Sequence, residues 1–360
     1  MSELYRPYIR LIIMVDPYAY CNDIGITNPD TDLINKIRNT YTPIIINRYP
    51  DEFDISCSIE TGNIDNGSVS NITCEVSITN LSSYIKFQML NKHYSKLKIQ
   101  VGYLGQDYTY DSDISKYSLS TLFSGTIAWI GTTIEQRSNV ITKMIGLANI
   151  STDTASIYNT AFSVSFSGSY NCYQLLRELV QNSNNPDFIL NQSSVDTIEL
   201  TDEVGSVNMN NINQILSKYS TITTYDFENS TLYDIDFYMK LNSSTIKPTE
   251  DNTIEINEDT GLIGIPTLET GSTPVVKFDC LFNPALKLYN FVKINNYDIQ
   301  MPTQSDPETA LTATNLGNYL NYDGYYKIVK ITYDLETRGS NFKQSIEASP
   351  YNIFKTTTGQ

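Results

Sequence analysis

The chain has little charge and almost none of the residues on which catalytic sites depend. Only 18% of its 360 residues are charged, and histidine and tryptophan occur once each. A general base needs a nucleophile and an orienting acid beside it. The single histidine, His93, has neither nearby in the sequence and stands between an expected helix and strand. We therefore expect an exposed loop histidine, no enzyme, no catalytic residue and no cofactor.

The cysteines are too scattered to form a zinc site or a disulfide framework. There are five, none in CxxC spacing: Cys21, Cys57, Cys74, Cys172 and Cys280. An odd, dispersed set favours reduced, mostly buried thiols, and so a protein made and folded in a cytoplasm. Acidic runs such as Asp111-Ser112-Asp113 could bind calcium through oxygen, but the EF-hand spacing is absent. We expect solvated loops there and no bound metal.

Basic clusters and long apolar runs are also missing. The chain has 24 Lys and Arg against 40 Asp and Glu, which gives a net charge of −16. Binding to DNA or to anionic membranes needs basic patches, so we expect neither, although an acidic channel could let DNA pass without sticking. The apolar run Ile9–Val15 is too short to span a membrane. It is interpreted as a first β-strand, and no stable membrane insertion is expected.

The residues that are abundant favour β-structure. Hydrophobic residues make up 40% of the chain and tyrosine occurs 27 times, which supports real cores and strands. Apolar and polar residues alternate between 72 and 79 and between 97 and 103, as in strands with one buried face. Ser82 or Ser83 could cap a short helix through Tyr84, Phe87 and Leu90. With strands at Leu122–Ile130 and Asn139–Leu147, this third of the chain predicts a small closed or nearly closed barrel.

The rest of the chain divides into a mixed section and a second β section. Helices are expected near Tyr173–Val180 and Ser206–Tyr219, and a strand at Tyr233–Leu241. Later strands are expected at Pro274–Cys280, Phe291–Ile299, Tyr325–Tyr333 and Asn341–Ala348. The predicted fold class is mainly β, with two related small β-barrel domains of tube type and a mixed α/β domain. The predicted limits are 1–155 for the first barrel, 156–270 for the α/β domain, 271–350 for the second barrel and 351–360 for a tail.

The last section resembles a second copy of the first. The hairpin that begins at Gly125-Thr126-Ile127 and returns through Arg137–Thr142 parallels one that begins at Gly324-Tyr325-Tyr326 and returns through Arg338–Lys343. Each follows an alternating strand and a long polar loop. We interpret this as an internal duplication.

Several segments together resemble a known family. Gly261-Leu262-Ile263-Gly264-Ile265-Pro266, followed by Cys280–Leu286, is similar to the G-L-I-G-x-P … LLNPxL stretch of baseplate hub proteins of contractile-tailed phages, including Mu-like ones. Gly324–Ile328 and Ile346-Glu347-Ala348 resemble that family's last two strands. Asn80-Leu81-Ser82, Val101-Gly102-Tyr103 and Leu122–Ile127 resemble its first barrel. The likeness spans about 55–350. It departs at Lys287–Asn290, where many relatives have Pro-Gly, and it does not reach the first 50 residues.

The resemblance implies a structural protein of the virion, at the baseplate of a phage tail. Such hubs are homotrimers in which each chain contributes two tube-like barrels, so three chains present six barrels to a hexameric tail tube. The implied partners are the tail tube protein, the central spike protein and other baseplate proteins. DNA passes through the central channel during ejection, without specific binding.

Interface candidates follow from the strands of the two repeats. They are Phe123, Ile127, Trp129, Phe291, Ile294, Tyr325, Ile328 and Ile331. A receptor- or carbohydrate-binding β-protein at the tail tip is the alternative, with a concave patch of tyrosines and Trp129 as its mark. A cell-wall-degrading enzyme is a third reading, and it lacks a recognisable catalytic set.

Overall fold

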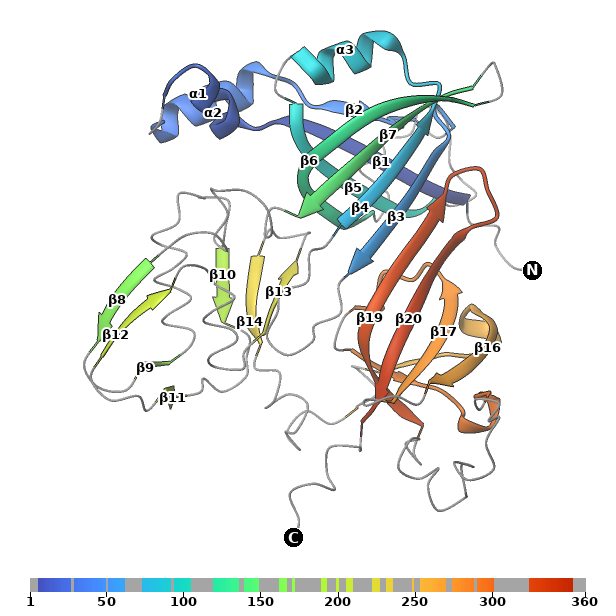
Figure 1. Ribbon diagram of the computed structural model, residues 1–360. Coiled ribbons are helices and arrows are strands. Elements are labelled where there is room, and N and C mark those ends of the chain that lie inside the picture. The colour runs from blue at the N-terminus through green and yellow to red at the C-terminus, as the bar shows by residue number, and fades with distance from the viewer. Residues whose placement is uncertain are drawn as a thin grey trace.

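The computed structural model places two β units of one chain in a single sheet (Figure 1). It describes residues 6–26, 29–49, 51–61, 73–91, 94–104, 119–135, 139–148, 253–269, 274–287, 290–300 and 324–351, with Pro248 and seven short strands between 162 and 235. The sheet has 13 strands and confirms the mainly β fold class.

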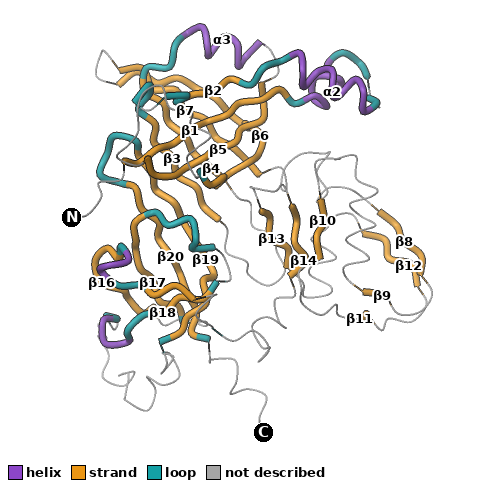
Figure 2. Tube along the Cα trace, turned by 180° about the vertical axis from the view of Figure 1, so that it is seen from behind, coloured by secondary structure: helices purple, strands orange, loops and turns teal. Residues whose placement is uncertain are grey.

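The N-terminal β unit holds seven of these strands and the three α-helices of the described residues. Its strands are β1 (Arg6–Val15), β2 (Ile44–Ile46), β3 (Ile55–Thr61), β4 (Thr73–Thr79), β5 (Tyr94–Leu104), β6 (Ser120–Glu135) and β7 (Asn139–Ala148). Its helices are α1 (Pro17–Asp23), α2 (Thr31–Thr40) and α3 (Ser83–Asn91), and they lie at the end of the unit away from the C-terminal β unit (Figures 1 and 2).

The helix starts follow ordinary capping rules. The Asp30 carboxylate accepts a hydrogen bond from the Leu33 amide at 2.7 Å and caps α2. The Ser82 hydroxyl accepts one from the Ile85 amide at 3.3 Å, as expected from the sequence. These bonds satisfy amides that the first helical turn leaves without partners.

The C-terminal β unit holds the other six strands. They are β15 (Thr253–Glu255), β16 (Leu262–Glu269), β17 (Val275–Leu281), β18 (Phe291–Lys293), β19 (Tyr325–Glu336) and β20 (Phe342–Pro350), with short 3₁₀ turns at η4 (Glu258–Thr260) and η5 (Asn296–Asp298). The predicted limit between 270 and 271 passes between β16 and β17, which are paired. The domain limits stay a prediction.

The strand expected over Phe291–Ile299 is wrong beyond Lys293. The chain instead turns through η5, where the Asn295 side chain accepts a hydrogen bond from the Tyr297 amide at 3.2 Å. Asparagine competes with sheet pairing through such local bonds, so the pair Asn295-Asn296 ends the strand.

Seven short strands of the middle section form smaller sheets beside the two units (Figure 1). They are β8 (Phe162–Phe166), β9 (Tyr170–Asn171), β10 (Ile189–Gln192), β11 (Glu199–Leu200), β12 (Gly205–Met209), β13 (Ile222–Asp226) and β14 (Thr231–Ile235). The helix expected from Ser206 is wrong at its start, because these residues pair with β8 as part of β12. The alternation of Val207 and Met209 with Ser206 and Asn208 suits a strand. The remainder of that helix, and the one expected near Tyr173–Val180, lie outside the described residues.

The two units repeat one strand order. The N-terminal unit runs β3-β4-β7-β6-β5 and the C-terminal unit runs β16-β17-β20-β19-β18, with every neighbouring pair antiparallel. In both units, the five strands, numbered along the chain, lie side by side in the order first, second, fifth, fourth, third. A sixth strand flanks each set, but β1 runs antiparallel to β5 whereas β15 runs parallel to β18.

A β-bulge marks equivalent positions in the two hairpins. In β6 the register shifts between Ile127 and Trp129, opposite Gly146 and Ile145 of β7. In β19 it shifts between Ile328 and Lys330, opposite Ala348 and Glu347 of β20. Bulges re-aim a strand and raise its twist, so both hairpins bend at the same point.

These registers correct the alignment expected from the sequence. Gly125 pairs with Ala148, and the equivalent pair in the second unit is Tyr326 with Pro350. Gly125 therefore corresponds to Tyr326 and not to Gly324. In the return strand, Thr142 corresponds to Gln344 and not to Lys343, because Thr142 pairs with Ile78 and Gln344 pairs with the equivalent Cys280. Both Thr142 and Gln344 are fully buried polar residues.

Candidate functional site: the junction of the β units and their exposed edges

A β-ladder joins the two units directly. Strand β19 pairs with β18 through Tyr325–Lys327 and, beyond its bulge, with β3 from Ile331 to Glu336. Leu335 stands opposite Cys57 in this second part, and both side chains are buried. One strand thus belongs to both units, and backbone hydrogen bonds fix the angle between them.

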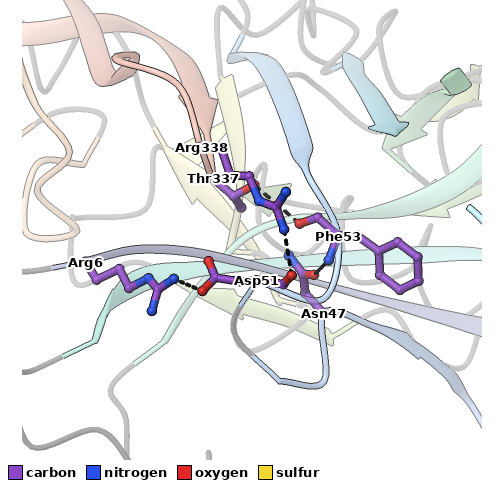
Figure 3. Close-up of polar contacts among 6 residues, drawn as sticks. All are labelled: Arg6, Asn47, Asp51, Phe53, Thr337 and Arg338. Carbon is purple, nitrogen blue, oxygen red and sulfur yellow. Dashed lines mark hydrogen bonds and ion pairs between the residues drawn. The ribbon is translucent and has the colours of Figure 1, made fainter. Parts of the chain in front are cut away.

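The loop before β3 latches onto the turn after β19 (Figure 3). Thr337 exchanges two bonds with Ile55: its hydroxyl accepts from the Ile55 amide, and its own amide donates to the Ile55 carbonyl, both at 2.9 Å. The Arg338 guanidinium donates to the Asp51 carbonyl at 2.7 Å, and the Asp51 carboxylate forms an ion pair with Arg6. Asp51 therefore links the start of β1 to the β19–β20 turn. We call these contacts of Asp51 and Thr337 the latch.

Asn47 holds this loop in shape. It is fully buried with a left-handed backbone of φ 55°, which asparagine tolerates better than most residues. Its amide nitrogen donates to the Ile9 carbonyl at 3.1 Å, and its amide oxygen accepts from the Phe53 amide at 2.6 Å. The Tyr8 hydroxyl donates to the Asn47 carbonyl. These bonds occupy the edge of β1 beyond its pairing with β2.

An aromatic cluster closes the other side of the junction. Tyr103, from β5 of the N-terminal unit, has its ring centroid 5.2 Å from Phe342 and 6.1 Å from Phe282 of the C-terminal unit. Phe282 lies 5.7 Å from Phe342 and 6.2 Å from Tyr333. Burial raises the pKa of Tyr103 to about 12. Since β5 is far from β19 in the strand order, the N-terminal unit must curl to bring Tyr103 here.

A row of alternating charges crosses the polar face of the joined sheet. The Lys277 ammonium lies 2.8 Å from the Glu269 carboxylate and 3.2 Å from that of Glu347. Lys330, opposite Glu347 in the register, forms an ion pair with Glu60 at 2.6 Å. Three glutamates alternate with two lysines over five neighbouring strands, so the row carries one net negative charge. It presents neither a basic patch nor a strongly acidic one.

Most of the expected interface residues lie inside the chain's own core. Phe123, Phe291, Ile294, Ile328 and Ile331 are at most 2% exposed. Their apolar side chains stabilise each unit, and as placed they offer no surface to a second molecule. In an alternating strand every second side chain points into the core of its own unit, and the four of these residues that lie in strands occupy such positions.

The other three candidates are more accessible. Ile127 and Tyr325 are half-buried, and Trp129 is 50% exposed. The Trp129 ring lies against Gly131, where a Cβ atom would come within 2.2 Å of it. One face of the only tryptophan is therefore covered by its own strand, which leaves less of it for stacking on a sugar.

Other apolar side chains are more exposed than the candidates, and sequence reasoning missed them. Ile134 at the end of β6 is 74% exposed, and Ile265 in β16 is 66% exposed. On α3, Tyr84, Phe87 and Leu90 are each at least 64% exposed. Exposed apolar side chains grouped on one element mark contact surfaces. The helical spacing of these α3 residues, which the sequence already places in one short helix, was the available signal.

The part of the chain that the structure describes shows little that could support chemistry. It contains no group of three or more His, Cys, Asp or Glu side chains that could hold a metal ion, and none of its helices is long and apolar enough to span a membrane. Burial raises the pKa of Cys74 to about 12 and that of Cys280 to about 11, so both stay as thiols near neutral pH. His93 and Asp111–Asp113 lie outside the described residues.

Comparison with known proteins finds likeness in structure only. No protein-family model and no curated protein sequence matches the chain. Solved structures that resemble it include a type VI secretion system component of E. coli, described as structurally similar to the phage T4 tail proteins gp27 and gp5, at 10% identity and a TM-score of 0.45 over 83% of this chain and 73% of that one. A tail protein of Neisseria meningitidis has 8% identity and a TM-score of 0.45, over 85% of this chain and 98% of that one.

A 43 kDa tail protein of a Shewanella oneidensis prophage is similar to the same degree. It has 8% identity and a TM-score of 0.44, over 84% of this chain and 99% of that one. All three TM-scores lie below 0.5, so a function has to be argued from the chain's own residues and topology.

Proposed function

We propose that the chain is a structural component of a phage-type tail, and in particular a trimeric baseplate hub. Three copies would form a ring that seats a trimeric spike on a hexameric tail tube and leaves a channel for DNA. The observation that carries this proposal is the repeated strand order of the two β units. Two similar units per chain convert threefold symmetry into approximate sixfold symmetry.

The junction supports the proposal because a ring adaptor needs a fixed angle between its units. The β3–β19 ladder, the latch around Asp51 and Thr337, and the Tyr103 cluster hold the units at three separate places. A rigid pair of units costs less conformational entropy on assembly than two units on a flexible linker.

The charge row fits the face that would line the channel. DNA slides most easily past a surface that neither binds its phosphates nor repels them over a long distance. The alternating row across β16, β17, β20, β19 and β3 has this character. We propose that this face turns toward the channel, and that tube and spike proteins contact the two ends of the ring.

The test is the mass and shape of the purified chain in solution. We expect multi-angle light scattering to give the mass of three chains, and electron microscopy to show a ring with a central hole. A single chain at all concentrations would overturn the proposal. Stoichiometric binding to a glycan array by a single chain would favour the carbohydrate-binding alternative instead.

A further inference from the structure

Half of β6 has a free edge where its counterpart β19 has a partner. Residues Ser120–Thr126 of β6 pair with β5 on one side, and residues Gly125–Glu135 pair with β7 on the other. Beyond the bulge, residues 127–135 have no second neighbour among the described strands. In β19, Ile331–Glu336 correspond to residues 130–135 of β6, and they pair with β3.

The side chains at this edge differ in burial as the pairing predicts. Ile134 and Leu335 are equivalent, because they stand opposite the equivalent residues Val140 and Phe342. Leu335 is 0% exposed under β3, whereas Ile134 is 74% exposed. Ile134 thus lies on the core-facing side of its strand without the cover that β3 gives Leu335.

The missing cover should be the strand equivalent to β3, which is β16. Both are the first strand of a hairpin, and they occupy the same place in the repeated order. By the registers, Cys57 of β3 corresponds to residues 264–266 of β16. The register of β16 shifts there as at a bulge, and Ile265 is 66% exposed. Gly264 has a left-handed backbone of φ 73° that permits this bulge.

We infer that the end of β6 in one copy docks on β16 of a second copy, with Ile134 against Ile265. This rests on the proposed function, since the contact repeats around a ring of three. Within a chain, β3 covers β19; between chains, β16 of one copy covers β6 of the next. The partner is a second copy of this chain because the chain already contains the same contact between its own two units.

Besides its register shift, β16 differs from β3 in having part of its backbone edge occupied. The amide of Gln300 donates to the Pro266 carbonyl, and the Leu268 amide donates to the Gln300 carbonyl, at 2.7 and 3.0 Å. These bonds occupy the backbone edge of β16 that a full ladder would use. The docking of β6 therefore depends on apolar side chains at residues 264–265 more than on backbone hydrogen bonds.

Disulfide trapping tests the contact. In a Cys172→Ser background, the double variant Ile134→Cys, Ile265→Cys should give covalently closed trimers under mild oxidation, because the four described native cysteines are buried. The matched control is Ile24→Cys, Ile265→Cys, since Ile24 is also exposed, at 54%. We expect at least tenfold less trimer from it.

A second variant makes the test independent of oxidation. We expect Ile134→Asp to change the mass from three chains to one while the circular dichroism spectrum stays unchanged, and Ile24→Asp to leave the trimer intact. A wild-type trimer that shows no specific crosslink and survives Ile134→Asp would overturn this inference and leave the hub proposal standing. A wild-type chain that stays single would overturn the hub proposal, and with it the inference.

Discussion

Asn47 is a single residue that joins two segments of the N-terminal unit, β1 and the loop before β3. Its side chain bonds the Ile9 carbonyl and the Phe53 amide, and its carbonyl accepts from Tyr8. It combines full burial with a left-handed backbone, so its amide group and its backbone conformation can be tested separately.

Asn47→Ala should lower the free energy of unfolding by roughly 3 to 5 kcal/mol, because a buried carbonyl and a partly buried amide lose their partners and alanine resists the left-handed conformation. Asn47→Gly should cost about 1 kcal/mol less, since glycine accepts that conformation. Urea unfolding followed by circular dichroism measures both. Asn139→Ala, at an exposed position, serves as the control and should stay within about 0.5 kcal/mol of wild type. Equal losses for Ala and Gly would contradict the role of the backbone.

At this scale the sequence predicts which residues are apolar and alternate, but not what covers them. Phe123 and Ile134 both belong to β6, yet the first is fully buried and the second largely exposed. Alternation assigns side chains to one face of a strand. Whether that face meets its own core, another unit or solvent depends on strands distant in the sequence, so the interface candidates were mostly core residues.

Among the elements, the repeated hairpins show how far a sequence alignment can go. Aligning Gly125 with Gly324 found the repeat, but the registers of β6 and β19 differ from it by two residues. A slip of two keeps every side chain on the same face, so hydrophobic alternation cannot detect it. In the return strand the slip was one residue, and the burial of Thr142 and Gln344 corrects it.

The aromatic cluster of the junction leads to a prediction about alkaline pH. Burial raises the pKa of Tyr103 to about 12, whereas an unfolded tyrosine titrates near pH 10. Above about pH 10 the unfolded chain loses this proton and the folded chain keeps it, so stability is lost as the pH rises from about 10 to 12. Tyr103→Phe should therefore show a smaller fall in unfolding free energy between pH 9 and pH 11.5.

The comparison needs an exposed tyrosine as its reference. Tyr297 is 96% exposed, and Tyr297→Phe should reproduce the wild-type fall between the two pH values. Urea unfolding at each pH gives the free energies. An equal fall in Tyr103→Phe and wild type would mean that the Tyr103 hydroxyl ionises as readily in the folded chain as in the unfolded one.

For the whole molecule, net charge sets the relation to nucleic acid. The chain carries −16, and the charge row that spans both units is close to neutral. Repulsion from phosphates outweighs any local attraction when basic clusters are absent.

We therefore expect no binding of double-stranded DNA at 50 mM salt and micromolar protein, measured by fluorescence anisotropy. A basic DNA-binding protein in the same buffer is the positive control. Binding that weakens as salt is added would reveal a cationic surface and would contradict a channel through which DNA only slides.

Alternation, composition and turn residues act locally, so the residues alone predict a mainly β, acidic chain in which one hairpin pattern occurs twice. The folded arrangement was needed to show that β19 joins β3, that Tyr103 reaches the C-terminal unit, and that Ile134 lacks the cover that Leu335 has. These features depend on backbone pairing between strands more than 200 residues apart. No local pattern encodes which of several similar strands will be the neighbour.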